Sequence, residues 1–280
     1  MSRMLSTEVK ILSDGNMKMD GGSMFGSMPK LSWENTVPTD RKNRITLGLN
    51  CLLLQIGGKN ILVDTGIGPK DHEKNKEALG LVPSRLLKGL RNLGIRPKDI
   101  NKVVLTDLQF DHSGGCTRMD RAGNLVATFP KAEYYVQRKC WDSASNLNER
   151  NMDKHDVDDY QPLFEKGQLE MLDGDSEIMP GLQVIRTDGC ADGHQVVLFN
   201  HGGERIVFLG DLIPTHHHLN LGVISAFDHA PEKTLEQKRF ILEEAEKQGW
   251  LLVFAHGHDT KAGYLEKRNS TTYLRPIEFE

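Results

Sequence analysis

Short apolar segments alternate with turns along most of the chain, and this pattern predicts a protein rich in β-strands. The aliphatic run Val103–Leu105 is typical of a short buried strand, because nothing in it needs contact with water. Gly57-Gly58 and Gly202-Gly203 each separate two apolar runs and predict hairpin turns. Further strands are predicted over residues 9–12, 45–56, 60–63, 129–136, 169–172, 182–185, 196–199, 206–209 and 250–254.

Helices are predicted between these strands, over residues 83–93, 137–144 and 232–247. Leucines recur on one face of the first, which Gly94 ends, and Pro231 and Gly249 flank the last. A helix between two strands indicates an α/β arrangement. Residues 20–44, rich in glycine and proline, are expected to form a long loop near the mouth of a site. The polar segment 146–160 is expected to be solvated, with His155 exposed.

The overall composition is that of an ordinary globular protein, and it excludes several classes of function. The 280 residues fit a single domain over 1–280, and hydrophobic residues make up 38%. A net charge of −4 without a basic run gives no support to nucleic-acid binding. No apolar segment approaches the ~20 residues that a membrane helix needs. The N-terminus lacks the apolar core of a signal peptide, which favours the cytoplasm. The cysteines are scattered without a CxxC pair, so free thiols are expected; they are Cys51, Cys116, Cys140 and Cys190.

Candidate chemistry is concentrated directly after the strand at Val103–Leu105. Asp107, Gln109, Asp111 and His112 follow within a few residues, and Gly114-Gly115 closes the run. A strand that ends in a tight polar loop can direct several side chains at one point. Carboxylate and imidazole groups gathered in this way are what a transition-metal site needs.

This stretch resembles the metallo-β-lactamase superfamily, whose loop reads Thr-His-x-His-x-Asp-His-x-Gly-Gly after a strand. The resemblance extends from Thr46 to Gly263, with the motifs in the family's order. It implies an α/β (α+β) fold: an αββα sandwich of two mixed β-sheets flanked by helices. Among the branches of the family, the lactonase-like one is the most similar.

The resemblance also implies which residues bind metal. In the family, two ions share seven ligands, and the set of the second ion is kept here: Asp111, His112, Asp211 and His256. One zinc ion is expected, with iron or manganese as alternatives, and Asp111 and Asp211 are the candidate catalytic residues. Asp64, in a Val-Asp-Thr-Gly segment, is expected to contact the metal ligands rather than the ion itself. His218 is expected to touch substrate near the mouth of the site. His194 is structural in relatives, and His216 and His217 are expected to be exposed.

The first metal site of the family is altered. Asp107 and Gln109 replace the two histidines of His-x-His, and Cys190 replaces the third histidine. Three interpretations follow. The site is lost, or it is rebuilt from these three side chains, or Cys190 acts as a thiol beside the remaining ion, which could lower its pKa.

The resemblance implies a metal-dependent hydrolase that acts on a small, uncharged or weakly charged ester or lactone. One alternative is a non-catalytic homologue that binds a metal or a ligand, and another is a rebuilt iron or manganese site with different chemistry, such as redox chemistry. The expected partner is a small-molecule substrate, with no nucleic acid and no membrane; a homodimer is left open.

Overall fold

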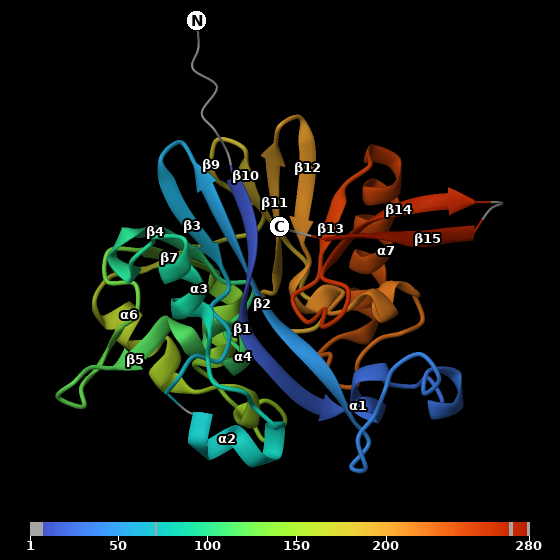
Figure 1. Ribbon diagram of the computed structural model, residues 1–280, viewed down its shortest axis with the longest axis horizontal. Coiled ribbons are helices and arrows are strands. Elements are labelled where there is room, and N and C mark those ends of the chain that lie inside the picture. Colours follow the sequence, from blue (N-terminus) through green and yellow to red (C-terminus); the bar gives the residue numbers. More distant parts are fainter. Residues whose placement is uncertain (1–7, 71, 269–270, 279–280) are drawn as a thin grey trace, which may run out of the picture.

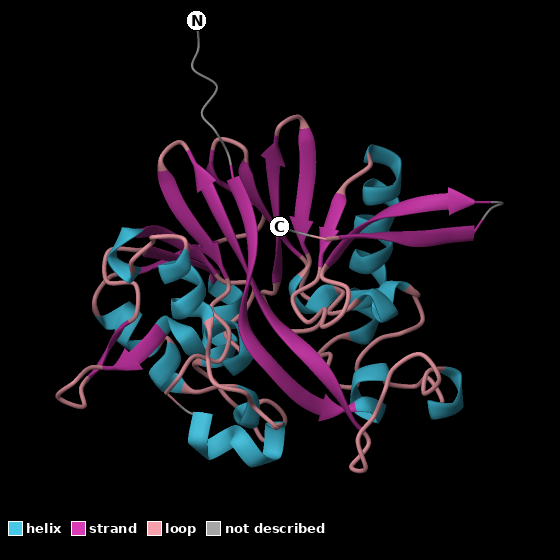
Figure 2. Cartoon of the chain, in the orientation of Figure 1, coloured by secondary structure: helices cyan, strands magenta, loops and turns pink. Residues whose placement is uncertain are grey.

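The computed structural model describes residues 8–70, 72–268 and 271–278, in which two mixed β-sheets pack face to face (Figure 1). Residues 1–7 lie outside these ranges, and so does most of the N-terminal segment that is expected to lack a signal peptide. Helices cover the outer faces of both sheets (Figure 2). The predicted αββα sandwich is therefore confirmed.

The first sheet has six strands in the order β1-β2-β3-β4-β7-β8. β1 and β2 form a long antiparallel ribbon, β2 and β3 are also antiparallel, and the remaining neighbours are parallel. The strands are β1 (Glu8–Asp20), β2 (Arg44–Ile56), β3 (Lys59–Val63), β4 (Ile100–Val104), β7 (Glu133–Gln137) and β8 (Leu169–Leu172).

The second sheet has seven strands in the order β15-β14-β13-β12-β11-β10-β9, antiparallel except for β12 and β13. Its strands are β9 (Ser176–Met179), β10 (Leu182–Arg186), β11 (Gln195–His201), β12 (Glu204–Phe208), β13 (Leu251–Val253), β14 (Ala262–Arg268) and β15 (Thr271–Ile277). A small hairpin of β5 (Thr117–Met119) and β6 (Leu125–Ala127) stands apart from both sheets.

Most of the helices are short. They are α1 (Gly21–Phe25), α2 (His72–Leu79), α3 (Leu86–Asn92), α4 (Phe110–Ser113), α5 (Arg138–Ala144), α6 (Gln161–Glu165) and α7 (Pro231–Gln248). Single 3-10 turns lie between them, including η1 (Lys30–Ser32), η4 (Met152–Lys154), η6 (Gly210–Leu212) and η7 (His216–Leu219). In the described part of the chain, no helix is both long enough and apolar enough to span a membrane.

Strand β2 shows how the sequence produces the layers. Successive side chains of a strand point to opposite faces. Leu52 and Leu54 are buried between the two sheets, whereas Cys51 and Leu53 are buried under the helices α3, α5 and α6. Both faces of the strand are thus covered, which explains why β2 reads as a continuous apolar run.

Helix α7 covers the outer face of the second sheet. Its buried residues Thr234, Lys238, Ile241 and Ala245 recur at helical spacing. The two apolar ones pack on the sheet, while the Lys238 ammonium donates hydrogen bonds to the carbonyl oxygens of Asn220 and Val223, at 2.6 and 2.8 Å. The helix thus also holds the loop before it.

The predicted loop 20–44 and the short strand before it needed correction. β1 runs on to Asp20, because Asp14-Gly15 forms a bulge in the ribbon rather than a turn that ends it. α1 and η1 then occupy part of the expected loop. Met24 of α1 does line the cavity described below, as the expected position near a site requires.

Gly26 lies where α1 packs against the loop before α7, and a substitution at this glycine tests that contact. Its φ is +57°, and a Cβ atom there would lie 1.9 Å from the Ile224 carbonyl oxygen. Gly26→Ala is expected to lower the free energy of unfolding by roughly 1–3 kcal/mol, because both strain and overlap must be relieved. A thermal melt measures this. Gly123→Ala, at φ +82° with no neighbour within 4 Å, is the control for backbone strain alone; equal shifts for the two variants would contradict the contact.

Candidate metal centre

The candidate site lies where strands of both sheets end at one edge of the sandwich. Asp107, Asp111 and His112 follow β4 of the first sheet, and α4 carries the last two. Asp211 lies in η6 after β12, and His256 follows β13. β12 and β13 are parallel neighbours, so the segments that follow them leave the second sheet at one edge. The segment after β4 of the facing sheet meets them there.

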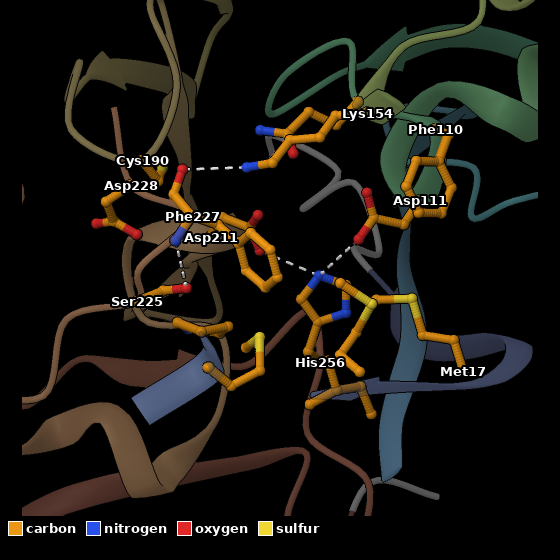
Figure 3. A pocket seen from close by; sticks show the side chains of 15 residues that line it. Met17, Phe110, Asp111, Lys154, Cys190, Asp211, Ser225, Phe227, Asp228 and His256 are labelled. Carbon is orange, nitrogen blue, oxygen red and sulfur yellow. Dashed lines mark hydrogen bonds and ion pairs between the residues drawn. The ribbon is translucent and has the colours of Figure 1, made fainter. Parts of the chain in front are cut away.

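The four residues predicted to bind metal converge on one point. The Nε2 atom of His256 lies 3.0 Å from an Asp211 carboxylate oxygen and 3.5 Å from one of Asp111. His112 Nε2 lies 3.5 Å from the same Asp211 oxygen and 4.0 Å from Asp111. Figure 3 shows the carboxylates of Asp111 and Asp211 on either side of the His256 ring.

His112 is oriented by Asp64. The Asp64 carboxylate accepts hydrogen bonds from His112 Nδ1 at 2.7 Å, and from the Thr106 amide and hydroxyl, each at 2.8 Å. The Nδ1 proton is thereby held on the far side of the ring, which leaves Nε2 as a lone-pair donor toward the cluster. Asp64 itself adopts a φ of +56°, which Asp tolerates better than most residues. Asp64 thus fixes the orientation of the His112 ring.

His256 is oriented in the same way by the backbone. Its Nδ1 donates a 2.8 Å hydrogen bond to the Gly48 carbonyl oxygen of β2. The backbone amide of His256 is bound to the Pro214 carbonyl oxygen, so both the ring and the chain are held. Both imidazoles consequently present Nε2 to the same space.

The charges of the cluster depend strongly on one another. Burial acts to lower the pKa of His112, but the carboxylates around it, led by Asp107 and Asp64, outweigh it and raise that pKa well above its usual value. Burial is likewise outweighed at His256, whose pKa is raised mainly by Asp211. The Asp211 carboxyl is partly buried, which acts to raise its pKa, yet the two imidazoles hold that pKa well below the usual range. This surplus of buried negative charge favours a cation.

Several buried polar atoms at this point have no hydrogen-bond partner. They are Asp107 Oδ2, Asp111 Oδ1, His112 Nε2 and His256 Nε2. Such atoms are costly to bury unless something binds them. Two sets of donor atoms lie close enough together to share an ion: Asp111, His112 and His256, and Asp107, His112 and Asp211. The residues present therefore fit a metal ion.

The three residues expected to form an altered first site are Asp107, Gln109 and Cys190, and they lie at different distances from the cluster. Asp107 is fully buried, belongs to one of the donor sets, and burial raises its pKa to about 7. Gln109 and Cys190 line the cavity beside the cluster. Cys190 is in neither donor set of the described residues, and burial raises the pKa of its thiol well above the usual value. The environment of Cys190 thus does not favour a thiolate.

Other histidines are placed differently from the expectations. His218 is 1% exposed, and both ring nitrogens are bound, to the Thr215 hydroxyl and to the Met24 carbonyl oxygen, so no nitrogen is left for a substrate. His216 and His217 are half-buried rather than exposed. His155 was also expected to be exposed, but it is half-buried because its Nδ1 donates to the Leu108 carbonyl oxygen. His194 is structural: it accepts a hydrogen bond from the Asp211 amide.

A mainly apolar cavity opens beside the cluster, and sequence reasoning missed most of its lining. The ribbon contributes Met17, α4 contributes Phe110, and the loop before α7 contributes Phe227 (Figure 3). Lys154 of η4 also reaches into it. These residues come from four separate parts of the chain, so no local pattern marks them. The cavity lies directly beside the candidate ligands.

Comparison with known families agrees with this geometry. The family model described as the metallo-beta-lactamase superfamily matches residues 45–256, which is most of the chain. The chain belongs to the metallo-β-lactamase superfamily. The match includes Asp64, Asp111, His112, Asp211 and His256.

Several relatives of this chain are lactonases. The chain is 25% identical to an N-acyl homoserine lactonase of Bacillus cereus over 179 residues, which are 60% of this chain and 64% of that protein. It is 24% identical to one of Bacillus thuringiensis over 226 residues, 76% and 82% of the two chains. A solved structure from Staphylococcus aureus, titled a "probable metal-dependent hydrolase", aligns with a TM-score of 0.87, 27% identity and 99% coverage of both chains. The chain is thus a metallo-β-lactamase-fold protein related at low identity to lactonases.

Proposed function

We propose that this protein is a metal-dependent hydrolase of a small-molecule ester or lactone. The observation that carries the proposal is the convergence of Asp111, His112, Asp211 and His256 on one buried point. The lactonases among the relatives support the substrate class. The neighbouring apolar cavity would receive the organic part of the substrate.

The four residues would hold one divalent ion, and the Asp107 carboxylate lies close enough to His112 and Asp211 to share an ion with them. Two imidazoles and several carboxylates suit Zn²⁺, and also Fe²⁺ or Mn²⁺. A bound ion would supply Lewis acidity that polarises the carbonyl group of the substrate.

The chain's own residues have separate tasks in this proposal. Asp64 and the Gly48 carbonyl fix the two imidazoles, so the site needs little rearrangement during the reaction. Asp111 or Asp211 takes a proton from the attacking water while the oxygen of that water forms a bond to the carbonyl carbon of the substrate. The bond from that carbon to the leaving oxygen then breaks, and the proton passes to the leaving alkoxide.

The altered first site leads to a prediction about metal content. One equivalent of transition metal per chain is expected after dialysis against a weak chelator, because no imidazole remains at positions 107, 109 and 190. The triple variant Asp107→His, Gln109→His and Cys190→His is expected to bind two, and its hydrolysis of esters or lactones to change. Elemental analysis measures the metal content. Two equivalents in the parent protein would contradict the single-ion site and favour one rebuilt from Asp107, Gln109 and Cys190.

The hydrolase itself is tested by assaying the metal-loaded protein on a broad panel of esters and lactones. Turnover that is lost on removal of the metal and restored by adding it back is the expected result. Binding of panel members without turnover would instead support a non-catalytic homologue, and ligand-induced shifts in melting temperature would detect it.

A further inference from the structure

A second, polar cavity adjoins the one beside the candidate metal centre. The two cavities share Gln109, Lys154, Cys190 and Phe227 as a common wall. The polar cavity is also lined by Arg150. Two basic residues of the segment 146–160 therefore face space that leads to the site.

The partners of these two cations are neutral. Lys154 is half-buried, and its ammonium donates a 3.0 Å hydrogen bond to the Phe227 carbonyl oxygen and lies 4.8 Å from the centre of the Phe227 ring. Arg150 donates to the Asp228 carbonyl oxygen, also at 3.0 Å. Neither side chain forms an ion pair with any residue of the described ranges. A carbonyl oxygen satisfies a hydrogen bond but does not neutralise a charge.

The acidic residues around the cavity are already directed elsewhere. Asp111 and Asp211 face the two histidines of the cluster. The Asp228 carboxylate also lines the cavity, but it is buried and accepts a hydrogen bond from the Thr234 hydroxyl at 2.6 Å. Figure 3 shows Lys154 reaching into the cavity from the side opposite His256. Lys154 is thus the cationic side chain that an anion would meet in the cavity beside the cluster, since Arg150 lines only the polar cavity.

We infer that Lys154 binds an anionic group, in particular a carboxylate, that the substrate carries at a distance from its ester or lactone carbonyl. This inference rests on the proposed hydrolase function. The carbonyl would lie at the metal cluster, an apolar linker against Met17 and Phe110, and the carboxylate at Lys154. Monoesters of dicarboxylic acids and lactones with a carboxylate side chain have this chemistry.

The sizes of the cavities suggest how the contact would form. The volumes are about 50 Å³ beside the cluster and about 100 Å³ on the polar side. A substrate that spans both must displace the wall between them. Lys154 can release the neutral Phe227 carbonyl oxygen for a carboxylate, because a charge-assisted hydrogen bond is the stronger of the two.

The test compares two esters that differ only at the distal end. Mono-4-nitrophenyl adipate ends in a carboxylate, and 4-nitrophenyl hexanoate ends in a methyl group. The metal-loaded parent protein is expected to prefer the adipate in kcat/KM. In Lys154→Met this preference is expected to fall about tenfold or more, the loss of one charge-assisted hydrogen bond. Lys154→Arg should retain it, and so should the control Lys247→Met, which removes an exposed lysine of α7.

A binding measurement separates this inference from the hydrolase proposal. Calorimetric titration of the metal-loaded protein with adipate and with hexanoate is expected to show tighter binding of adipate, which Lys154→Met abolishes. If adipate binds more tightly and Lys154→Met abolishes this, but neither ester is hydrolysed, the hydrolase proposal is contradicted for these substrates and the carboxylate site at Lys154 is supported. Hydrolysis of both esters with the same preference in the parent and in Lys154→Met would overturn the inference, as would a parent without preference. A purely structural role for Lys154 would lower both activities equally.

Discussion

Replacing His256 by alanine is expected to remove the metal ion and, with it, ester and lactone hydrolysis. Nε2 of His256 lies within 3.5 Å of both Asp111 and Asp211, so its loss leaves the carboxylates with one imidazole. Lewis acidity accounts for several kcal/mol of transition-state stabilisation, so kcat/KM should fall by ~10³-fold or more. Elemental analysis should show well under one equivalent of metal.

His258→Ala is the matched control for this experiment. His258 is an exposed histidine two residues further on, and its Nδ1 contacts Asn16 rather than the cluster. Metal content and activity are expected to remain at the parental level. If the parent turned over a broad panel no faster than His256→Ala, the hydrolase proposal would fail for those substrates. A binding protein would then be the leading alternative, and a thermal-shift screen for ligands the next experiment.

Asp64→Asn is expected to weaken metal binding about 10–100-fold, although Asp64 does not face the ion. The carboxylate accepts the Nδ1 proton of His112 and the hydroxyl proton of Thr106 through one oxygen. An amide nitrogen at that position would donate instead. His112 would then carry its proton on Nε2, and the nitrogen that faces the cluster would no longer be a ligand. Asparagine adopts positive φ readily, so the backbone at φ +56° should not change.

Competition with a chromogenic chelator measures the metal affinity of this variant. Thr106→Val is the control, because it removes the hydroxyl that contacts Asp64 and leaves the bond from Asp64 to His112 in place. Its affinity should fall much less than that of Asp64→Asn. Equal losses in both variants would indicate that packing around Asp64, rather than the position of the His112 proton, controls binding.

The sequence predicted the strands and the main cluster because both leave local patterns. Leu52, Leu53 and Leu54 form an apolar run, and a strand buried on both faces requires one. Asp111 and His112 directly follow a strand, and Asp211 and His256 follow two others. Because all four residues follow strands, their sequence positions indicated that the four side chains would lie close together.

The wall of the cavity could not be predicted in the same way. Lys154 lies in a segment that reads as solvated, and only the contact with Phe227, which is distant in the sequence, brings it to the site. His155 is half-buried through contacts with Leu108 and Tyr160 that no local pattern predicts. The difference between Asp107 and Cys190 is likewise one of distance: both are expected to stand in place of first-site histidines, but of the two only Asp107 belongs to a donor set.

Because the candidate ligands come from both sheets, an ion bound to them would tie together two parts of the chain that are otherwise joined by packing and by hydrogen bonds. All four cysteines are free, so no disulfide performs this task. Binding to the folded state alone adds about 1.4 kcal/mol to its stability for each tenfold rise in free metal above the dissociation constant. The amount of intact protein in a cell would then follow the metal supply, with proteolysis removing the chains that remain empty.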